Sequence, residues 1–329
     1  MNIKSVLITT SQRKRSVVSV PRIRLALRDW DHLVPLVTGR VRPRGFALEI
    51  ESRAITPDVL GEPGLHGGET SFSRYALGRG GGDDRLTGLP IFVMRAFRHR
   101  CVLVRRDSGL ATAKDLAGTR IGLTGWPDSG NTWTRALLRT AGVDLGGIAW
   151  TVGPPATGES GKDRVGSRPL PANVTVTDEP LVDGLAGGRY DAIFTPFMPG
   201  EMFTSGSRFR HLYDDHRDAE RDYFGHTGFV PGIHLLALRR EVADEHPWLP
   251  AALQETFEES KRQWLSRRRH LADTTPWLLA ELEDSTRVFG PDWMPYGAAA
   301  NAAMTAAFCA ELYEQGIAPH PIDAEEMFA

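Results

Sequence analysis

Segments typical of β-strands and of helices alternate along most of the chain, and this alternation is the strongest constraint on its fold. Residues 22–27 and 190–195 predict strands, the second of them fully buried. Residues 46–50 alternate apolar and polar side chains, as a half-buried strand does. Residues 120–124 predict a further strand, and helical segments lie between these strands. This order of elements predicts the α/β class.

Capping residues mark the ends of the helices that separate the strands. Thr112 predicts the start of a short helix that Gly118 ends. A second helix is predicted to start within residues 129–132 and to end at Gly142. Pro180 predicts the start of another short helix, because proline is tolerated in the first turn. The helix predictions therefore depend on capping as well as on periodicity.

The last third of the chain is predicted to be mainly helical. Pro247 lies in the first turn of one helix, and Gly316 ends another. Apolar residues at helical spacing form one face of each helix, and they are Leu249, Leu253, Phe257 and Trp264 in the first and Met304, Phe308 and Leu312 in the second. No fixed-period repeat occurs, which argues against a solenoid.

Three segments are predicted to lie outside this regular structure. Residues 1–20 lack the long apolar stretch of a secretion signal, and we expect them to form a flexible leader. Residues 78–84 are rich in glycine and predict a flexible loop, without the Gly-Lys-Ser/Thr ending of a phosphate-binding loop. Residues 153–173 are rich in Gly, Pro and Ser and predict a surface insertion.

Length and charge limit the functions that this chain can have. Its 329 residues are enough for a large core divided between two domains. The 39 Lys and Arg residues are balanced by 41 Asp and Glu residues, so no overall positive field favours nucleic acid or an anionic membrane as a partner. Cys101 and Cys309 are far apart in the sequence, which argues against a disulfide framework or a cysteine-ligated zinc site. No apolar run is long enough to cross a membrane, and we expect a cytoplasmic location.

Several short motifs follow one another in a characteristic order. They are Phe97-Arg98-His99 after an apolar strand, residues 107–123, Trp133 with Arg135, residues 185–192, Tyr223, Gly232-Ile233-His234 before a strand, residues 239–242 with His246-Pro247-Trp248, and residues 293–297. In this order and spacing they resemble the 4,5-dihydroxyphthalate decarboxylase family, from about Leu25 to Phe328. Residues 107–123 also resemble the start of the second lobe in type II periplasmic-binding-protein folds.

The resemblance implies a two-lobed α/β fold, a type II periplasmic-binding-protein-like clamshell with a helical C-terminal part. We expect residues 21–100 and 205–329 to form the first lobe and residues 101–204 the second. The resemblance also implies cofactor-independent decarboxylation of a small hydroxylated aromatic or heteroaromatic carboxylate. Relatives of this fold bind solutes for transporters without any reaction, so a non-catalytic solute-binding protein for a small organic anion is the alternative.

The sequence departs from the family pattern at three places. Glu69-Thr70-Ser71 stands where the family usually has an apolar residue between the Glu and the Ser. The glycine-rich segment 78–84 and the predicted insertion 153–173 are the other two. In this interpretation the insertion lies near the edge of the second lobe, and the identity of the substrate is left open.

The expected reaction decides which side chains are needed. A proton must reach the ring carbon that carries the carboxylate, a ring hydroxyl stabilises the intermediate, and carbon dioxide leaves as the ring regains aromaticity. The protein must therefore supply a proton donor, a group that binds the hydroxyl, and cations that orient carboxylates. No cofactor and no metal is expected. A small anionic aromatic substrate is the expected partner, and self-association into a homo-oligomer is left open.

The basic run before the second lobe contains the first candidates. His99 is the first choice for proton transfer, because imidazole titrates near neutral pH. Arg98 is suited to a carboxylate, since its planar guanidinium donates two parallel hydrogen bonds, and Arg95 is a second candidate for this role. The alternatives are a histidine that only hydrogen-bonds at the crossover between the lobes and arginines that are solvated.

Glu69 and His234 are further candidates for catalysis. Glu69 is predicted to accept the proton of a hydroxyl or to fix the tautomer of His99, with Ser71 and Ser73 as hydrogen-bond partners. An exposed glutamate is the alternative. His234 precedes a strand that returns from the second lobe, which would direct it toward the ligand, and a buried structural histidine is the alternative.

Residues 131–133 are candidates for substrate binding. Asn131 and Thr132 open a helix whose free backbone N–H groups attract a carboxylate. Trp133 is predicted to stack on an aromatic ring, although tryptophan more often belongs to a core.

Two charged clusters are interpreted as structural. The acidic run 214–218, with His211 nearby, contains potential metal ligands, but Arg217 and Arg221 would repel a cation, and we expect solvated charge. Asp29 and Asp31, with His32, follow the first strand; capping of the next helix is the simpler interpretation, and lining of the ligand cleft is the alternative.

Overall fold

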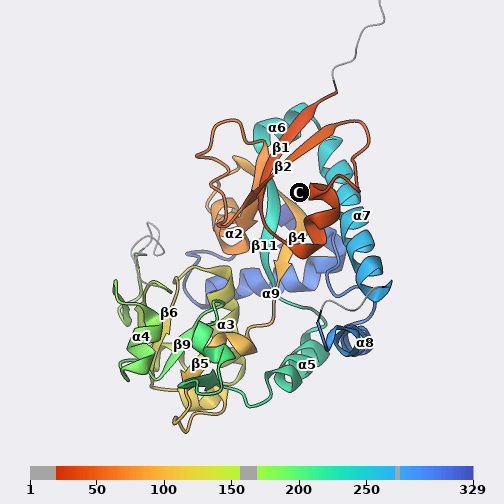
Figure 1. Cartoon of the computed structure of the whole chain (residues 1–329). Coiled ribbons are helices and arrows are strands. Elements are labelled where there is room, and N and C mark those ends of the chain that lie inside the picture. The colour runs from red at the N-terminus through yellow and green to blue at the C-terminus, as the bar shows by residue number, and fades with distance from the viewer. Residues whose placement is uncertain (1–19, 156–168, 271–274, 329) are drawn as a thin grey trace, which may run out of the picture.

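The computed structural model of this chain describes residues 20–155, 169–270 and 275–328. Two β-sheets form the centres of two lobes, and in Figure 1 the lobe that contains β1 lies above the lobe that contains β5. The predicted leader 1–20, apart from its last residue, and most of the predicted insertion 153–173 lie outside the described residues. None of the described helices is both long and apolar enough to span a membrane.

The first sheet has five strands in the order β2-β1-β3-β11-β4. Its strands are β1 (Arg22–Arg28), β2 (Ala47–Arg53), β3 (Gly67–Ser71), β4 (Leu86–Arg95) and β11 (Gly232–Arg239). Strand β1 is parallel to β2 and β3, whereas β11 is antiparallel to both of its neighbours. Strand β3 lies so close to β11 that a Cβ at Gly67 would be 2.4 Å from the carbonyl oxygen of Ala237. Glycine is therefore required at this position.

The second sheet has six strands in the order β10-β5-β9-β6-β7-β8. Its strands are β5 (Val102–Arg105), β6 (Arg120–Leu123), β7 (Ala149–Val152), β8 (Val174–Val176), β9 (Ala192–Phe194) and β10 (Phe209–His211). The four strands β9, β6, β7 and β8 are parallel, and β5 and β10 form an antiparallel edge.

Helices cover both sheets. They are α1 (Val34–Val37), α2 (Phe72–Gly80), α3 (Ser129–Thr140), α4 (Leu181–Ala186), α5 (His216–Thr227), α6 (Arg240–Glu245), α7 (Leu249–His270), α8 (Leu278–Phe289) and α9 (Ala298–Glu314). Short 3-10 turns are found at η1 (Asp31–Leu33), η2 (His99–Cys101) and η3 (Ala113–Leu116), among others. The last third is mainly helical, as predicted.

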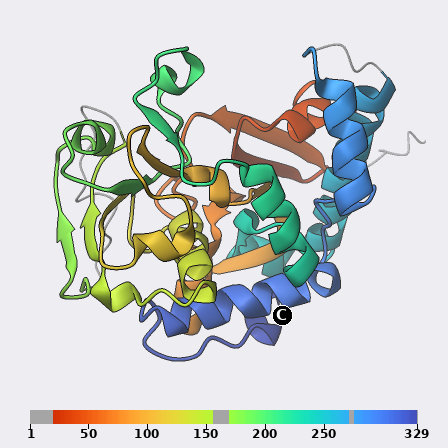
Figure 2. The same ribbon diagram turned by 90° about the horizontal axis from the view of Figure 1, so that it is seen from below.

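One hydrophobic core continues from the first lobe into the second. Phe72 and Phe92 of the first lobe belong to the same buried cluster as Trp150 of the second, and Phe308 of α9 packs among them. Figures 1 and 2 show α9 beside α3, between the two lobes. Arg139 of α3 forms ion pairs with the α9 residues Glu311 and Glu314. The lobes are thus joined along this side by a continuous interface.

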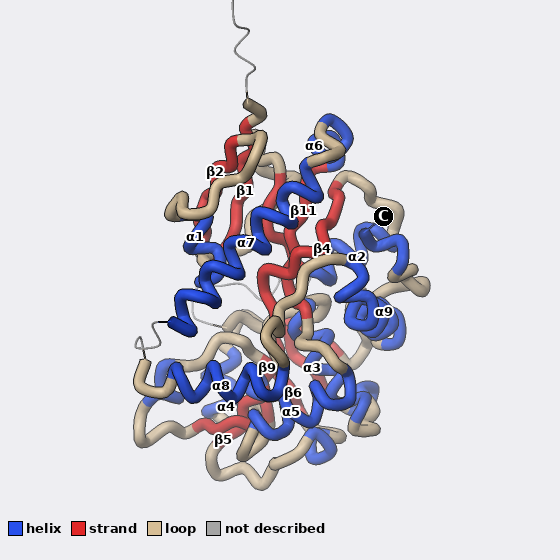
Figure 3. The backbone as a smooth tube through the Cα atoms, turned by 90° about the vertical axis from the view of Figure 1, so that its right-hand side faces the viewer, coloured by secondary structure: helices blue, strands red, loops and turns tan. Residues whose placement is uncertain are grey.

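Two connections link the lobes. The first runs from β4 through η2 to β5, and we call residues 95–101 the crossover segment. The second runs from β10 through α5 to β11, and α8 lies next to α5 in Figures 1 and 3. The predicted boundary at residue 204 falls too early, because β10 pairs with β5 and the second sheet therefore extends to His211. The rest of the predicted division into lobes stays a prediction.

Several local predictions are wrong. Residues 78–80 are the last turn of α2 and not a loop, because the buried residues Tyr75, Ala76 and Leu77 hold the helix against the core. Strands β3, β7, β8 and β10 were not predicted. Helix capping by Asp29 or Asp31 is absent, since η1 follows Trp30 without a side-chain cap, and Asp31 pairs with Arg268 at 3.5 Å.

Candidate functional site

Three strands of the first sheet bring polar side chains to the edge that faces the second lobe. The carboxyl ends of β1 and β3 and the start of β11 meet at this edge, where open α/β sheets bind ligands. Glu69 and Ser71 alternate with Thr70 and so point to one face of β3. His234 pairs directly with Ser71 in the antiparallel ladder, which puts its side chain on the same face.

Glu69 and His234 form a hydrogen-bonded pair. Glu69 is 0 % exposed, and its Oε1 lies 2.5 Å from Nδ1 of His234. Its Oε2 accepts hydrogen bonds from the backbone N–H of Arg28 at 2.9 Å and from the indole N–H of Trp30 at 2.8 Å. Burial alone would raise the pKa of Glu69, but the hydrogen bonds from His234, Arg28 and Trp30 hold it below its ordinary value. Glu69 is therefore an ionised, fully buried carboxylate.

The pairing leaves Nε2 of His234 free for chemistry. Nδ1 of His234 is the nitrogen that faces Glu69, so an N–H there leaves Nε2 as the acceptor or, in the imidazolium, as a second donor. The side chain of His234 is 14 % exposed, whereas Glu69 is inaccessible. A buried carboxylate that orients a partly accessible imidazole is the arrangement that acid–base enzymes use.

Three serines connect this edge to the second lobe. Ser71 Oγ lies 2.8 Å from Ser129 Oγ, which also accepts a hydrogen bond from the backbone N–H of Ser73 at 2.9 Å. Ser71 and Ser73 are 3.0 Å apart through their hydroxyl oxygens. Ser71 precedes α2 and Ser129 is the first residue of α3, so two helix N-termini face each other here. Both helix dipoles favour an anion at this place.

Arg98 reaches the same helix of the second lobe. It is 2 % exposed, its Nε donates to Thr134 Oγ1 at 3.3 Å, and no carboxylate pairs with it among the described residues. A Cβ at Gly130, in the first turn of α3, would be 2.7 Å from Nη2 of Arg98. Glycine thus lets the guanidinium lie against the start of the helix. A buried cation without a counter-ion is unfavourable and favours an anionic ligand.

The other predicted residues of α3 make structural contacts. Asn131 donates through Nδ2 to Thr124 and to the carbonyl of Gly125, which fixes the loop before α3, and its Oδ1 is buried without a partner among the described residues. Thr132 donates both its N–H and its hydroxyl to the carbonyl of Asp128. Trp133 belongs to the core, where its indole N–H donates to Gly232. The stacking role predicted for Trp133 does not fit this position.

His99 lies apart from the Glu69–His234 pair, on the crossover segment. Its ring contacts Tyr213 and Tyr223 edge to face, at centroid distances of 5.3 and 5.6 Å. Burial, with a smaller contribution from His216, lowers the pKa of His99 to about 4. Nδ1 is buried and has no hydrogen-bond partner in the described part of the chain. His99 is therefore neutral at physiological pH and has no carboxylate to orient it, which disfavours it as a proton donor.

Arg95 is also held in the interior. Its terminal nitrogens donate to the carbonyls of Val230 and Pro295 and to Asn301 Oδ1. Burial lowers its pKa to about 10, so it stays charged. These contacts tie β4 to α9 and leave only Nε without a partner among the described residues. The contacts of the described residues thus link Glu69 to His234, and Ser71 and Ser73 to Ser129 of α3, the helix that Arg98 contacts, whereas Arg95, His99 and Trp133 take part in none of these contacts.

Three residues of this site were missed in the sequence. Arg28 and Trp30 hold Glu69, and Ser129 bridges the lobes. The position of Arg28 and Trp30 at the end of the first predicted strand was a usable signal, because strand ends line ligand sites in such folds. Ser129 has no such signal, since its role depends on the approach of the two lobes. Asp215, in the acidic run, caps α5 by accepting from the N–H groups of Arg217 and Asp218.

Comparison with curated proteins relates the chain to one kind of enzyme. No protein-family model matches it. The 4,5-dihydroxyphthalate decarboxylase of Comamonas testosteroni is 29% identical over 328 residues, which cover 93% of this chain and 96% of that protein. The 4,5-dihydroxyphthalate decarboxylase of Pseudomonas putida is 32% identical over 162 residues, which cover 47% of this chain and 62% of that protein.

Comparison with solved structures defines the fold. The aliphatic sulphonate binding protein SsuA from Escherichia coli aligns with a TM-score of 0.56 at 16% identity, over 92% of this chain and 90% of that one. The alkanesulfonate-binding protein SsuA from Xanthomonas axonopodis, bound to MOPS, gives 0.54 at 14% identity, over 93% and 97%. The desulfurization enzyme DSZB gives 0.51 at 16% identity, over 94% and 96%. The chain is thus a sequence relative of the 4,5-dihydroxyphthalate decarboxylases, built on the two-lobed fold of type II periplasmic binding proteins, as its motifs predicted.

Proposed function

We propose that this chain is a carboxy-lyase that decarboxylates a small hydroxylated aromatic or heteroaromatic carboxylate at the junction between the lobes. The observation that carries this proposal is the buried Glu69–His234 pair, 2.5 Å apart, at the end of the first sheet where Ser71 meets Ser129 of α3, the helix that Arg98 also contacts. The names of its sequence relatives supply the reaction class.

His234 would move the proton. Its Nε2 delivers a proton to the ring carbon that carries the carboxylate, and Glu69 stabilises the imidazolium that exists before this transfer. The electron pair of the breaking carbon–carbon bond then returns to the ring, carbon dioxide leaves, and the added hydrogen remains on the ring carbon. His234 takes this role in place of His99, because only His234 has a carboxylate partner and a partly exposed ring.

Arg98 and the serines would hold the anionic groups. The guanidinium of Arg98 can donate two hydrogen bonds to one carboxylate, and the N-terminal N–H groups of α2 and α3 lie beside the serine bridge. The hydroxyls of Ser71 and Ser129 can exchange their mutual hydrogen bond for bonds to a ligand. A cytoplasmic location and self-association remain predictions.

The alternative is a solute-binding protein for a small organic anion. The fold similarity to sulphonate-binding proteins favours it, and a buried arginine against the first turn of α3, with no carboxylate partner among the described residues, serves binding as well as catalysis. The Glu69–His234 pair separates the two functions. A binding protein has no need of an imidazole that is oriented by a buried carboxylate.

The deciding experiment measures carbon dioxide release from a panel of ortho- and para-hydroxylated aromatic acids, including 4,5-dihydroxyphthalate. We expect release from at least one acid, and a loss of about 100- to 10,000-fold in kcat for His234→Gln. His226→Gln is the matched control, because His226 is an exposed histidine of α5 that lies outside the site.

Two outcomes would contradict the proposal. Tight binding of an aromatic acid without release, measured by calorimetry, would favour the solute-binding protein. Release that is unchanged in His234→Gln would leave decarboxylation standing and would reject the role of His234.

A further inference from the structure

A cavity lies beside the crossover segment, and neither Glu69 nor His234 lines it. Its volume is about 260 Å³, below the roughly 300–1,000 Å³ of sites for drug-sized ligands. Its apolar walls are Phe97, Val230, Val288, Phe289 and Trp293. None of the residues assigned to the junction site lines it. A cavity of this size and lining is suited to a compound with a single ring.

Two buried polar atoms of this lining have no hydrogen-bond partner among the described residues. They are Oε1 of Glu220, a residue of α5 that is 9 % exposed, and Nε of Arg95, which is 8 % exposed. Unpaired buried groups of this kind are costly and are rare in folded proteins. The other carboxylate of the lining, Asp284, is paired with Arg217 and Arg221. The unmet hydrogen-bonding capacity of this lining therefore includes one acceptor and one donor.

The charge states of these two residues match a neutral polar group in the cavity that both of them line. Burial raises the pKa of Glu220 to about 7, against the opposing effect of Arg100, and burial lowers the pKa of Arg95 to about 10. Arg95 is thus a cation and Glu220 is close to half ionised near neutral pH. A hydroxyl group matches this pair, because one oxygen atom can donate to Glu220 and accept from Arg95.

We propose that this cavity is a binding site for a small phenol. The ring of the phenol would pack against Phe97, Phe289 and Trp293, and its hydroxyl would satisfy the free oxygen of Glu220 and the free nitrogen of Arg95. Aromatic side chains give such a ring both buried area and favourable edge or face contacts. Nothing in this argument depends on the reaction at the junction of the lobes.

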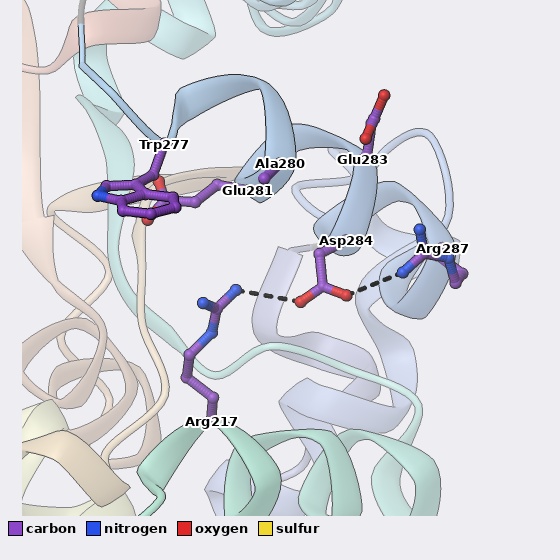
Figure 4. A pocket seen from close by; sticks show the side chains of 7 residues that line it. All are labelled: Arg217, Trp277, Ala280, Glu281, Glu283, Asp284 and Arg287. Carbon is purple, nitrogen blue, oxygen red and sulfur yellow. Dashed lines mark hydrogen bonds and ion pairs between the residues drawn. The ribbon is translucent and has the colours of Figure 1, made fainter.

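A larger pocket nearby does not have these properties. Its volume is about 530 Å³, and it lies beside α8, with Arg217, Asp284 and Arg287 joined by ion pairs in its lining (Figure 4). Trp277, its one aromatic residue, is 74 % exposed. Its charged groups are satisfied or solvated, so it lacks the unpaired buried atoms that single out the smaller cavity.

Calorimetric titration with phenol, benzene and cyclohexanol tests the proposal. We expect saturable binding of phenol at least tenfold tighter than that of benzene, because only phenol satisfies the two unpaired atoms, and weaker binding of cyclohexanol, which lacks the aromatic ring. Glu220→Met should weaken phenol binding at least tenfold. Glu283→Met is the matched control, since Glu283 is exposed on α8 and should leave binding unchanged.

Two further variants test whether the phenol binds in this cavity and not elsewhere. Ser285 lines the cavity, so Ser285→Phe should fill it and abolish binding while both unpaired residues are kept, and the proposal stays testable if Glu220→Met does not fold. Binding that persists in His234→Gln shows that the phenol is not held at the junction. Phenol that binds no tighter than benzene, or equally well to Ser285→Phe, would overturn the proposal. Such a result is expected if a water molecule satisfies both atoms.

Discussion

Two regions of this molecule bury a glutamate, and the pKa of the buried glutamate shifts in opposite directions in the two regions. At the junction of the lobes, Glu69 is fully buried but accepts three hydrogen bonds, and its pKa falls below the ordinary value. Beside the crossover segment, Glu220 keeps an oxygen without a partner, and burial raises its pKa to about 7. Burial is common to both glutamates. The difference between them is the supply of donors, and only the first region keeps a charge ready for catalysis.

The histidines repeat this contrast. His234 has a carboxylate within hydrogen-bond distance and an accessible ring edge. His99 is enclosed by two tyrosines, and burial lowers its pKa to about 4. The motif Phe97-Arg98-His99 therefore contains one residue suited to ligand binding and one that is structural in its surroundings. A motif marks a segment and does not decide which of its side chains reach the ligand.

The largest effect should separate the two glutamates. Glu69→Gln should lower kcat for decarboxylation by roughly 1,000- to 10,000-fold, because the amide loses the charge that orients and stabilises His234. Glu220→Gln should change kcat less than about twofold. Steady-state carbon dioxide release by the two variants measures this difference. Equal losses in both would break the comparison between the regions.

A second effect concerns stability against pH. The pKa of Glu220 is about 7 in the folded chain and 4.5 without burial, so the folded state holds this proton more strongly. The stabilisation is complete below pH 4.5 and is lost as the pH rises through 7, by about 3 kcal/mol at most. Glu220→Gln removes this loss.

Urea unfolding between pH 5 and pH 8 measures the effect. The stability of Glu220→Gln relative to the natural chain should rise across this range. His99 affects stability at low pH, because its lowered pKa makes the folded state less stable as the pH falls from 6.5 through about 4. This loss is the same in the natural chain and in Glu220→Gln, so it does not change their relative stability. A relative stability that does not change with pH would show that Glu220 is paired in solution.

Much of the fold was predictable because it depends on local patterns. Strands β1, β6 and β9 and helices α3, α4 and α9 appear where periodicity and caps placed them. Strand β3 was not predictable in this way, since its sequence Gly-Gly-Glu-Thr-Ser has little strand propensity. It forms because β3 pairs with its two neighbours, β1 and β11, and because Gly67 permits close contact with β11.

The sequence allowed the individual residues of the candidate site to be predicted, but not which of them contact one another. Glu69, Ser71, Arg98 and His234 were identified singly, and their sequence separations gave no sign that Glu69 pairs with His234 and not with His99. That pairing depends on the register of β3 against β11, a long-range property. The burial of Arg95 and Trp133 has the same origin, because both contact the C-terminal helix α9 or its neighbours.

A smaller effect should test the place of Arg98 against α3. Gly130→Ala places a methyl group 2.7 Å from Nη2 of Arg98 and must displace the guanidinium. We expect about tenfold weaker binding of an aromatic carboxylate, the cost of one misplaced charge-assisted hydrogen bond. Gly225→Ala in α5 is the control, since nothing lies within 4 Å of its added methyl group. Unchanged affinity in Gly130→Ala would show that Arg98 does not contact the ligand.

The smallest effect concerns the exposed charges next to the crossover side. Asp284 of α8 pairs with Arg217 of α5 at 3.1 Å and with Arg287 of its own helix at 3.1 Å (Figure 4). It also pairs with Arg221 of α5 at 2.7 Å. Hydrogen bonds from Arg221 hold the pKa of Asp284 below its ordinary value. Because water and salt screen exposed ion pairs, Asp284→Asn should lower Tm by about 2 °C or less.

Salt dependence makes this last prediction decisive. The difference in Tm between Asp284→Asn and the natural chain should shrink as ionic strength rises. Salt weakens the ion pairs of Asp284 in the natural chain, and the variant has no such ion pairs to lose. The effect of Glu220→Gln should persist in high salt, since it arises from burial and not from exposed charges. A large, salt-independent loss in Asp284→Asn would mean that α8 depends on a buried charge pair. The crossover side would then contain a buried, paired carboxylate as well, and the contrast with the junction would not hold.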